Sequence, residues 1–174
     1  MVAAQAPEAG EEVYLTLDEA LKIAFPRADR VKTEDRAPTF EERRRIEERL
    51  GWRVPEPSFR FYVGEKSGAV QGYALVMDEI GKERPITFMV KVDPDGRVED
   101  VSVMVYRESI GSEVKRSGFL KQFRGKSGSD RLRVGREIGS ITGASLSCRA
   151  IAAGVKKAVV LADELCVSTK PVSR

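Results

Sequence analysis

The run Ile86-Thr87-Phe88-Met89-Val90-Lys91-Val92 places apolar residues at every second position, which is the period of a strand with one buried face. The turn-forming residues Asp93-Pro94-Asp95-Gly96 come next, and a second apolar run follows from Val98 to Val105. Two more runs, 59–63 and 71–77, precede them along the chain. Four short runs separated by turns predict an antiparallel meander with one face on a core.

Two capping boxes predict helices before this meander. Thr16-Leu17-Asp18-Glu19 and Thr39-Phe40-Glu41-Glu42 both place glutamate three residues after a threonine. The first helix is expected to stop at Pro26, and the second near Leu50, where Gly51 can cap it.

A terminal helix is predicted over residues 144–166 from a long apolar stripe facing the sheet. Its members are Ile151, Val155, Ala158, Val159, Ala162 and Leu165. Cys148 and Cys166 would lie ~27 Å apart along this helix, too far for a disulfide, so both are interpreted as packing residues. The predicted fold class is therefore α+β, an antiparallel sheet packed on helices with a long C-terminal helix. We expect one domain over 13–166, with a flexible lead-in over 1–12 and a flexible tail over 167–174.

The composition narrows the possible functions. The 174 residues are 41% hydrophobic and 33% charged, with a net charge of +3, an ordinary balance that does not indicate nucleic-acid binding. The chain has no histidine and two cysteines, which argues against Ser-His-Asp catalysis and against zinc sites built on histidine or four cysteines. No metal is expected. The charged run 41–45 is interpreted as a solvated helix face with i,i+4 pairs.

The small-residue stretch Thr142-Gly143-Ala144-Ser145-Leu146-Ser147 lies where the terminal helix is expected to begin. Small residues allow close approach of a ligand, and the unpaired N–H groups of a helix N-terminus suit a phosphate. The simpler interpretation is a tight loop and helix cap, in which Ser145 or Ser147 only accepts an N–H bond.

This stretch resembles the [S/T]-G-A-[S/T]-x-[S/T] signature of the FMN-binding domain family, found in flavin subunits of the Rnf complex and of the sodium-translocating NADH:quinone oxidoreductase. Residues 119–126, Phe-Leu-Lys-Gln-Phe-Arg-Gly-Lys, are similar to the family's F-x-x-Q-F-x-G-K run. Residues 106–114 stand in place of its Glu-Thr-Pro-Gly-Leu-Gly loop, shorter and without the proline. The resemblance covers roughly residues 60–166 and predicts that FMN is the cofactor.

In that family a flavin transferase joins the FMN phosphate to the hydroxyl that closes the G-A-[S/T] triplet, here Ser145. The resemblance implies a flavin site made of ten residues: Thr142, Gly143, Ala144, Ser145, Leu146, Ser147, Arg149, Glu108, Ser109 and Gly111. The motif and Arg149 would hold the phosphate, and the loop 108–111 would wrap the ring. The alternative interpretations are a solvent-exposed arginine for Arg149 and a surface carboxylate at the end of a strand for Glu108. Trp52 and Tyr62 are further candidate ring neighbours, whereas Phe119 and Phe123, four residues apart, are predicted to be core.

Two positions depart from the family pattern. Gly139 stands where the fuller transferase signature has aspartate, and Ser145 stands where threonine is usual. Serine keeps the hydroxyl, but the missing aspartate makes the covalent link a separate expectation from flavin binding. Glu137 lies too early in the sequence to replace it.

The resemblance implies an electron carrier whose chemistry belongs to the flavin, rather than an enzyme with its own substrate. Its expected partners are redox proteins or a membrane electron-transfer complex, plus the flavin transferase, and its expected location is extracytoplasmic. Three alternatives stay open: a noncovalent FMN carrier, an interaction module that no longer binds flavin, and a flavin reductase or oxidase. A G-x-G-x-x-G dinucleotide fingerprint in a βαβ setting is absent from the sequence.

Overall fold

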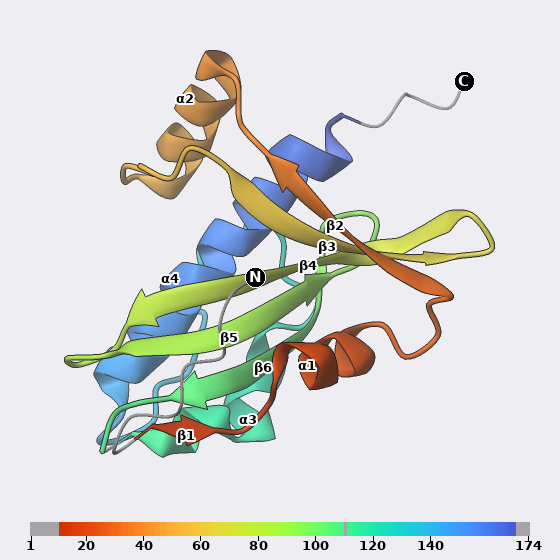
Figure 1. Cartoon of the computed structure of the whole chain (residues 1–174). Helices are drawn as coiled ribbons and strands as arrows, with labels where there is room; N and C mark the ends of the chain where they lie inside the picture. Colours follow the sequence, from red (N-terminus) through yellow and green to blue (C-terminus); the bar gives the residue numbers. More distant parts are fainter. Residues whose placement is uncertain (1–10, 110, 170–174) are drawn as a thin grey trace.

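The computed structural model describes residues 11–109 and 111–169, and its central element is a six-stranded antiparallel sheet in the order β1-β6-β5-β4-β3-β2. Helix α1 covers one face of the sheet, and α4 lies across the other (Figure 1). The elements are β1 Glu12–Val13, α1 Leu17–Ala24, β2 Arg30–Arg36, α2 Phe40–Leu50, β3 Phe59–Lys66, β4 Ala69–Ile80, β5 Pro85–Val92, β6 Val98–Tyr106, the 3₁₀ turns η1 Ser112–Lys115 and η2 Lys121–Phe123, α3 Ser117–Leu120, α4 Ser145–Ala162 and the π-helical turn η3 Asp163–Val167. The predicted α+β fold class is confirmed.

The two capping boxes form as predicted. In α1 the Thr16 hydroxyl accepts the N–H of Glu19, and the Glu19 carboxylate accepts the N–H of Thr16. The same reciprocal pair joins Thr39 and Glu42 at the start of α2, and Gly51 ends that helix at φ +81°. These local hydrogen bonds satisfy backbone donors that each helix start leaves unpaired.

The meander β3-β4-β5-β6 follows the chain order as predicted, but the expectation of one buried face is wrong, because alternate residues pack into two cores on opposite faces of the sheet. Phe88 and Val90 of β5 face the larger core beneath α4, while Met89 faces the smaller core beneath α1. The sequence did not reveal β1 and β2, which pair with β6 and β3 at the two edges of the sheet. The side chains of β2 are all exposed or half-buried, so this strand lacks the apolar alternation that identified the others.

Helix α4 packs closely on β4 and β5 through Gly154, where a Cβ would lie 2.3 Å from the Phe88 ring. All six residues of its predicted apolar stripe are buried. Cys148 and Cys166 are also buried in the larger core and form no disulfide with each other, which confirms their interpretation as packing residues.

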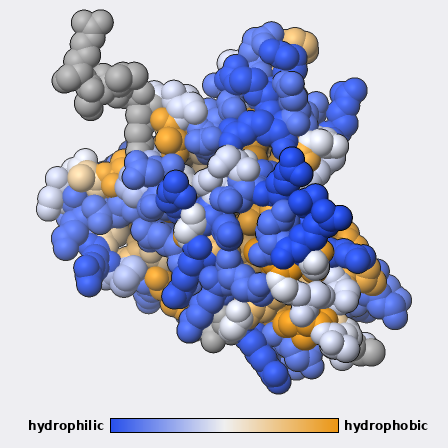
Figure 2. Space-filling model, turned by 180° about the vertical axis from the view of Figure 1, so that it is seen from behind, coloured by the Kyte–Doolittle hydropathy of each residue, from blue (hydrophilic) through white to orange (hydrophobic). Residues whose placement is uncertain are grey.

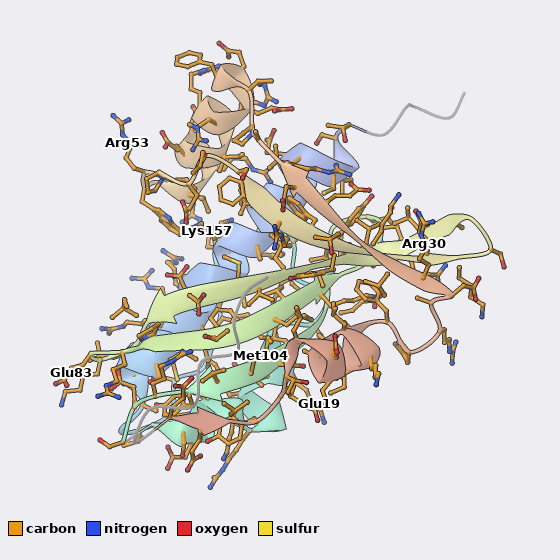
Figure 3. The ribbon with its side chains drawn as sticks, in the orientation of Figure 1. Glu19, Arg30, Arg53, Glu83, Met104 and Lys157 are labelled. Carbon is orange, nitrogen blue, oxygen red and sulfur yellow. The ribbon has the colours of Figure 1, made fainter. Side chains whose placement is uncertain are left out.

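Helix α2 is joined to the C-terminal end of α4 by charge pairs. Glu164, whose side chain is 9% exposed, accepts bonds from Arg45 at 2.9 Å and Arg49 at 3.0 Å. Lys157 projects from α4 to the Glu56 carboxylate between α2 and β3 (Figure 3). Part of the charged run 41–45 therefore faces η3 rather than solvent alone, although Arg44 keeps the expected surface pairs.

The ends of the chain are described in part. Residues 1–10 and 170–174, most of the expected lead-in and tail, lie outside the described residues, whereas Glu12 is in β1 and Val167 ends η3. In the described part, none of the helices has the length and hydropathy that a bilayer crossing requires.

Candidate functional site

The small-residue motif forms the turn that leads into α4, with Ser145 as the first helical residue. Gly143 has φ +81°, a conformation that suits glycine, and the N-cap Ala144 offers no side-chain hydrogen bond to the helix. The first helical bond runs from the Cys148 N–H to the Ala144 carbonyl at 2.9 Å. The N–H groups of residues 145–147 therefore precede the hydrogen-bond ladder of the helix, the arrangement that suits an anion.

The two motif serines have different surroundings. Ser145 is exposed, and its Oγ lies 3.4 Å from the Ser140 hydroxyl. Ser147 is buried, and its hydroxyl shares a 3.1 Å hydrogen bond with the Tyr106 hydroxyl. Burial raises the pKa of Tyr106, and the bond to Ser147 opposes that shift. Ser145 is thus the accessible hydroxyl of the pair, while Ser147 ties α4 to the end of β6.

The other motif residues and Arg149 also divide by exposure. Thr142, Gly143, Leu146 and Arg149 are exposed, and Ala144 is buried. Ser145 and Arg149 are four residues apart, so they lie on one face of α4, about one turn from each other.

Gly111 brings the loop after β6 against the start of α4. At φ +92° it lies so close that a Cβ would be 2.7 Å from the Tyr106 hydroxyl, 3.1 Å from Ser147 Oγ and 3.5 Å from the Ala144 Cβ. The structure therefore places two separate predicted segments, 108–111 and 142–147, side by side. Ile110 lies outside the described residues.

The Glu108 carboxylate is not free to bind a ligand at this junction, because it is bonded to another turn. Its Oε1 accepts the N–H groups of Glu83 at 2.6 Å and Arg84 at 3.0 Å, in the turn between β4 and β5. Partial burial pushes the pKa of Glu108 upward, but the N–H groups of Arg84 and Glu83 outweigh it, and the pKa is lowered. The side chain therefore holds a turn, and Figure 3 shows Glu83 at the tip of that turn. Ser109 is exposed next to it.

A clamp that the sequence did not predict fixes the segment before the motif. Gln122 accepts the Gly139 N–H at 2.7 Å and donates to the Gly139 carbonyl at 3.3 Å. The Glu137 carboxylate accepts hydrogen bonds from the backbone N–H and the guanidinium of Arg133. These bonds hold the pKa of the Glu137 carboxyl at about 2. Glu137 is therefore committed elsewhere and does not supply the carboxylate missing at position 139.

The aromatic candidates fall into three places. Phe119 and Phe123 pack edge to face in the larger core, which confirms their interpretation as core residues. Tyr62 packs with the smaller core on the opposite face of the sheet from α4. Trp52 instead lines a hollow of about 290 Å³ together with Arg149.

Comparison with known proteins agrees with this arrangement. A family model described as the FMN-binding domain matches residues 81–160, which include the loop after β6, the Gln122 clamp and the motif. Residues 81–160 belong to the FMN-binding domain family. The predicted family is confirmed, and with it FMN as the cofactor.

Two curated relatives and one solved structure show how far the likeness reaches. A subunit of the proton-translocating ferredoxin:NAD(+) oxidoreductase complex of Clostridium ljungdahlii is 30% identical over 107 residues, 57% of each protein. A subunit of the Na(+)-translocating ferredoxin:NAD(+) oxidoreductase complex of Acetobacterium woodii is 26% identical over 131 residues, 70% of this chain and 63% of the relative. The chain thus spans less than two thirds of these relatives. Shewanella oneidensis NqrC shares the fold, with a TM-score of 0.53, 15% identity and coverage of 78% of this chain and 80% of NqrC.

Proposed function

We propose that this chain is an electron carrier that holds FMN at the start of α4 through an ester to Ser145. The observation that supports the proposal most is the exposed Ser145 hydroxyl beside the N–H groups of residues 145–147, within a segment of the FMN-binding family. An anionic phosphate at this position would gain hydrogen bonds and a favourable helix field without displacing a capping side chain.

The described residues would have distinct tasks at this site. Gly143 allows close approach of the phosphate, and the exposed Thr142 hydroxyl and Arg149 guanidinium would bind its oxygens. Ser147 and Gly111 act indirectly, because they fix the start of α4 against β6. When bound, FMN supplies one- and two-electron redox chemistry, and the protein sets its position and solvent access.

The ester requires an activated flavin nucleotide and a transferase. A bond forms between Ser145 Oγ and the flavin phosphorus, the bond from phosphorus to the activating group breaks, and the hydroxyl proton leaves. The absence of a carboxylate at Gly139 supports a second candidate, a carrier with noncovalent FMN, because the family signature read by the transferase is incomplete there.

The relatives named above are subunits of ferredoxin:NAD(+) oxidoreductase complexes that translocate protons or sodium ions. We propose, by this likeness, that the chain passes electrons between redox centres of a membrane complex and works on the outer side of the cytoplasmic membrane.

The test is production of the protein with and without a flavin transferase, followed by a denaturing gel under ultraviolet light and intact mass. We expect a fluorescent band whose mass is raised by one FMN less the water lost on ester formation. The band should be lost in Ser145→Ala and kept in Ser140→Ala, a control that removes the neighbouring exposed hydroxyl. A flavin ester that survives in Ser145→Ala would contradict the assignment. A dark band from yellow protein would support the noncovalent carrier, and colourless protein after incubation with FMN would refute both.

A further inference from the structure

A basic groove runs beside α4 on the helix face that carries Ser145. Trp52 lines it together with four cationic side chains, Arg131, Arg133, Arg149 and Lys156. The two cations on α4, Arg149 and Lys156, follow Ser145 by four and eleven residues, so the groove begins about one turn, ~6 Å, from that serine. We name this hollow the Trp52 groove.

No carboxylate is among the residues that line the Trp52 groove. Two other hollows of the described chain are mixed in charge, since Asp100 lines one and Glu79 lines the other along with cations. An unbalanced set of cations attracts an anionic partner, because few local carboxylates offset the positive potential.

The cations of the groove differ in whether they are already engaged. Lys156 donates to the carbonyls of Gly128 and Asp130 at 2.6 Å each, and burial lowers its pKa. Arg133 is bound to Glu137. Arg131 and Arg149 are exposed and form no hydrogen bond or ion pair with any residue that the structure describes. Two guanidinium groups are therefore available to a partner.

The loop that carries Arg131 is held in place rather than loose. Lys156 binds the two carbonyls just before it, and the Ser127 N–H bonds to Asp130 at 2.8 Å. Leu132 has φ +52° and is 3% exposed, so its side chain is fixed in the core in a conformation that leucine rarely adopts. Because the loop is already ordered, a partner that binds Arg131 would cause little further loss of backbone entropy.

The surroundings of the groove favour a protein partner. Trp52 is 41% exposed, and tryptophan and arginine are the residues most enriched at energetically important contacts. Arg53 follows Trp52 at the outer end of the loop after α2 (Figure 3). Viewed from the α4 side, the surface is mostly hydrophilic with smaller hydrophobic patches, as at a transient interface (Figure 2).

We propose that the Trp52 groove is the docking surface for an acidic one-electron carrier protein that exchanges electrons with the flavin on Ser145. The proposal rests on the proposed function for its electron transfer, but the groove itself can be tested without flavin. A partner bound in the groove would lie beside the helix face that bears the cofactor. Charge attraction would therefore hold the partner where the distance for electron transfer is short.

The first experiment uses flavin-free protein, because Trp52 is the one tryptophan of the 174 residues and its fluorescence reports on the groove alone. Poly-L-glutamate is the probe, and poly-L-lysine is the matched cation. We expect a saturable change with polyglutamate that weakens as salt is raised to about 0.15 M, and none with polylysine. Arg131→Glu should weaken polyglutamate binding about tenfold, and Arg27→Glu, an exposed site without ion pairs in the described chain, by less than about twofold.

The second experiment uses the flavin-loaded protein, whose flavin content is measured first by absorbance. Electron transfer from the reduced protein to acidic cytochrome b5 and to basic cytochrome c is followed by stopped flow. Arg131→Glu should lower the rate constant with cytochrome b5 about tenfold and raise that with cytochrome c, while Arg27→Glu leaves both nearly unchanged.

Equal polyglutamate binding by wild type and Arg131→Glu would overturn the proposal, whatever the flavin does. A Trp52 signal that responds to phosphatidylglycerol vesicles and not to polyglutamate would also overturn it, because the groove would then face a membrane. Absence of flavin with intact polyglutamate binding would refute the proposed function and leave the docking surface for an acidic partner standing.

Discussion

Gly111→Ala should destabilise the protein more than its backbone conformation alone explains. Gly111 has φ +92°, where a side chain costs about 1–2 kcal/mol. Its new Cβ would also meet the Tyr106 hydroxyl at 2.7 Å and Ser147 Oγ at 3.1 Å, so the buried bond between those hydroxyls must break or shift. Losing a buried hydrogen bond costs about 1–3 kcal/mol, which gives about 2–5 kcal/mol in total.

Gly143→Ala is the matched control for the backbone contribution. It has φ +81°, yet a Cβ there would meet no heavy atom within 4 Å. We therefore expect a loss of only about 1–2 kcal/mol. Urea unfolding of both variants at one temperature, without flavin, measures the free energies, and the difference between them isolates the contact at the start of α4.

Equal losses in the two variants would refute the reasoning, because the close approach of Gly111 to Tyr106 and Ser147 would then have no energetic weight. The double variant Gly111→Ala/Ser147→Ala should lose less free energy of unfolding than the sum of the two single variants, because both changes act on one hydrogen bond.

Two further predictions concern Glu79 and Gly139. Burial raises the pKa of Glu79 in the folded state, so its contribution to stability is greatest below the unfolded pKa and falls as the pH rises through the folded pKa. Glu79→Gln should therefore flatten the loss of stability from acid towards neutral pH, and an unchanged slope in urea midpoints against pH would contradict this. Gly139→Asp should raise the fraction of protein carrying a flavin ester, as measured by intact mass, because it restores the carboxylate of the family signature. The new Cβ would lie 3.2 Å from the Gln122 side chain, which needs to shift only slightly.

The elements that the sequence predicted are those specified by local chemistry. The capping boxes at Thr16 and Thr39 are closed within four residues. The alternation in 86–92 separates the residues of β5 that face the larger core from those on its other face, which is also buried. Strand β2 was missed because it is an edge strand of charged and half-buried residues. Its position depends on pairing with β3, which no local pattern indicates.

The candidate site was predictable only in part, for the same reason. The motif showed which residues begin α4, but it could not show that Ser147 turns inward to Tyr106, 41 positions earlier. The partner of Glu108 is a turn more than 20 residues away, and the clamp between Gln122 and Gly139 spans 17 residues. Such pairs are set by tertiary packing, so they become visible only in the folded chain.

The order of the strands has a consequence for when the proposed flavin site forms. From β3 to β6 each strand pairs with its predecessor in the chain, so these contacts form between near neighbours, whereas α4 must return over a long stretch of chain to dock on β4 and β5. Contacts between near neighbours form faster than distant ones, so α4 is expected to settle late in folding. Until then the chain presents Ser145 on a loose segment. A modifying enzyme that recognises only the docked start of α4 would therefore act on folded molecules and leave incompletely folded ones without flavin.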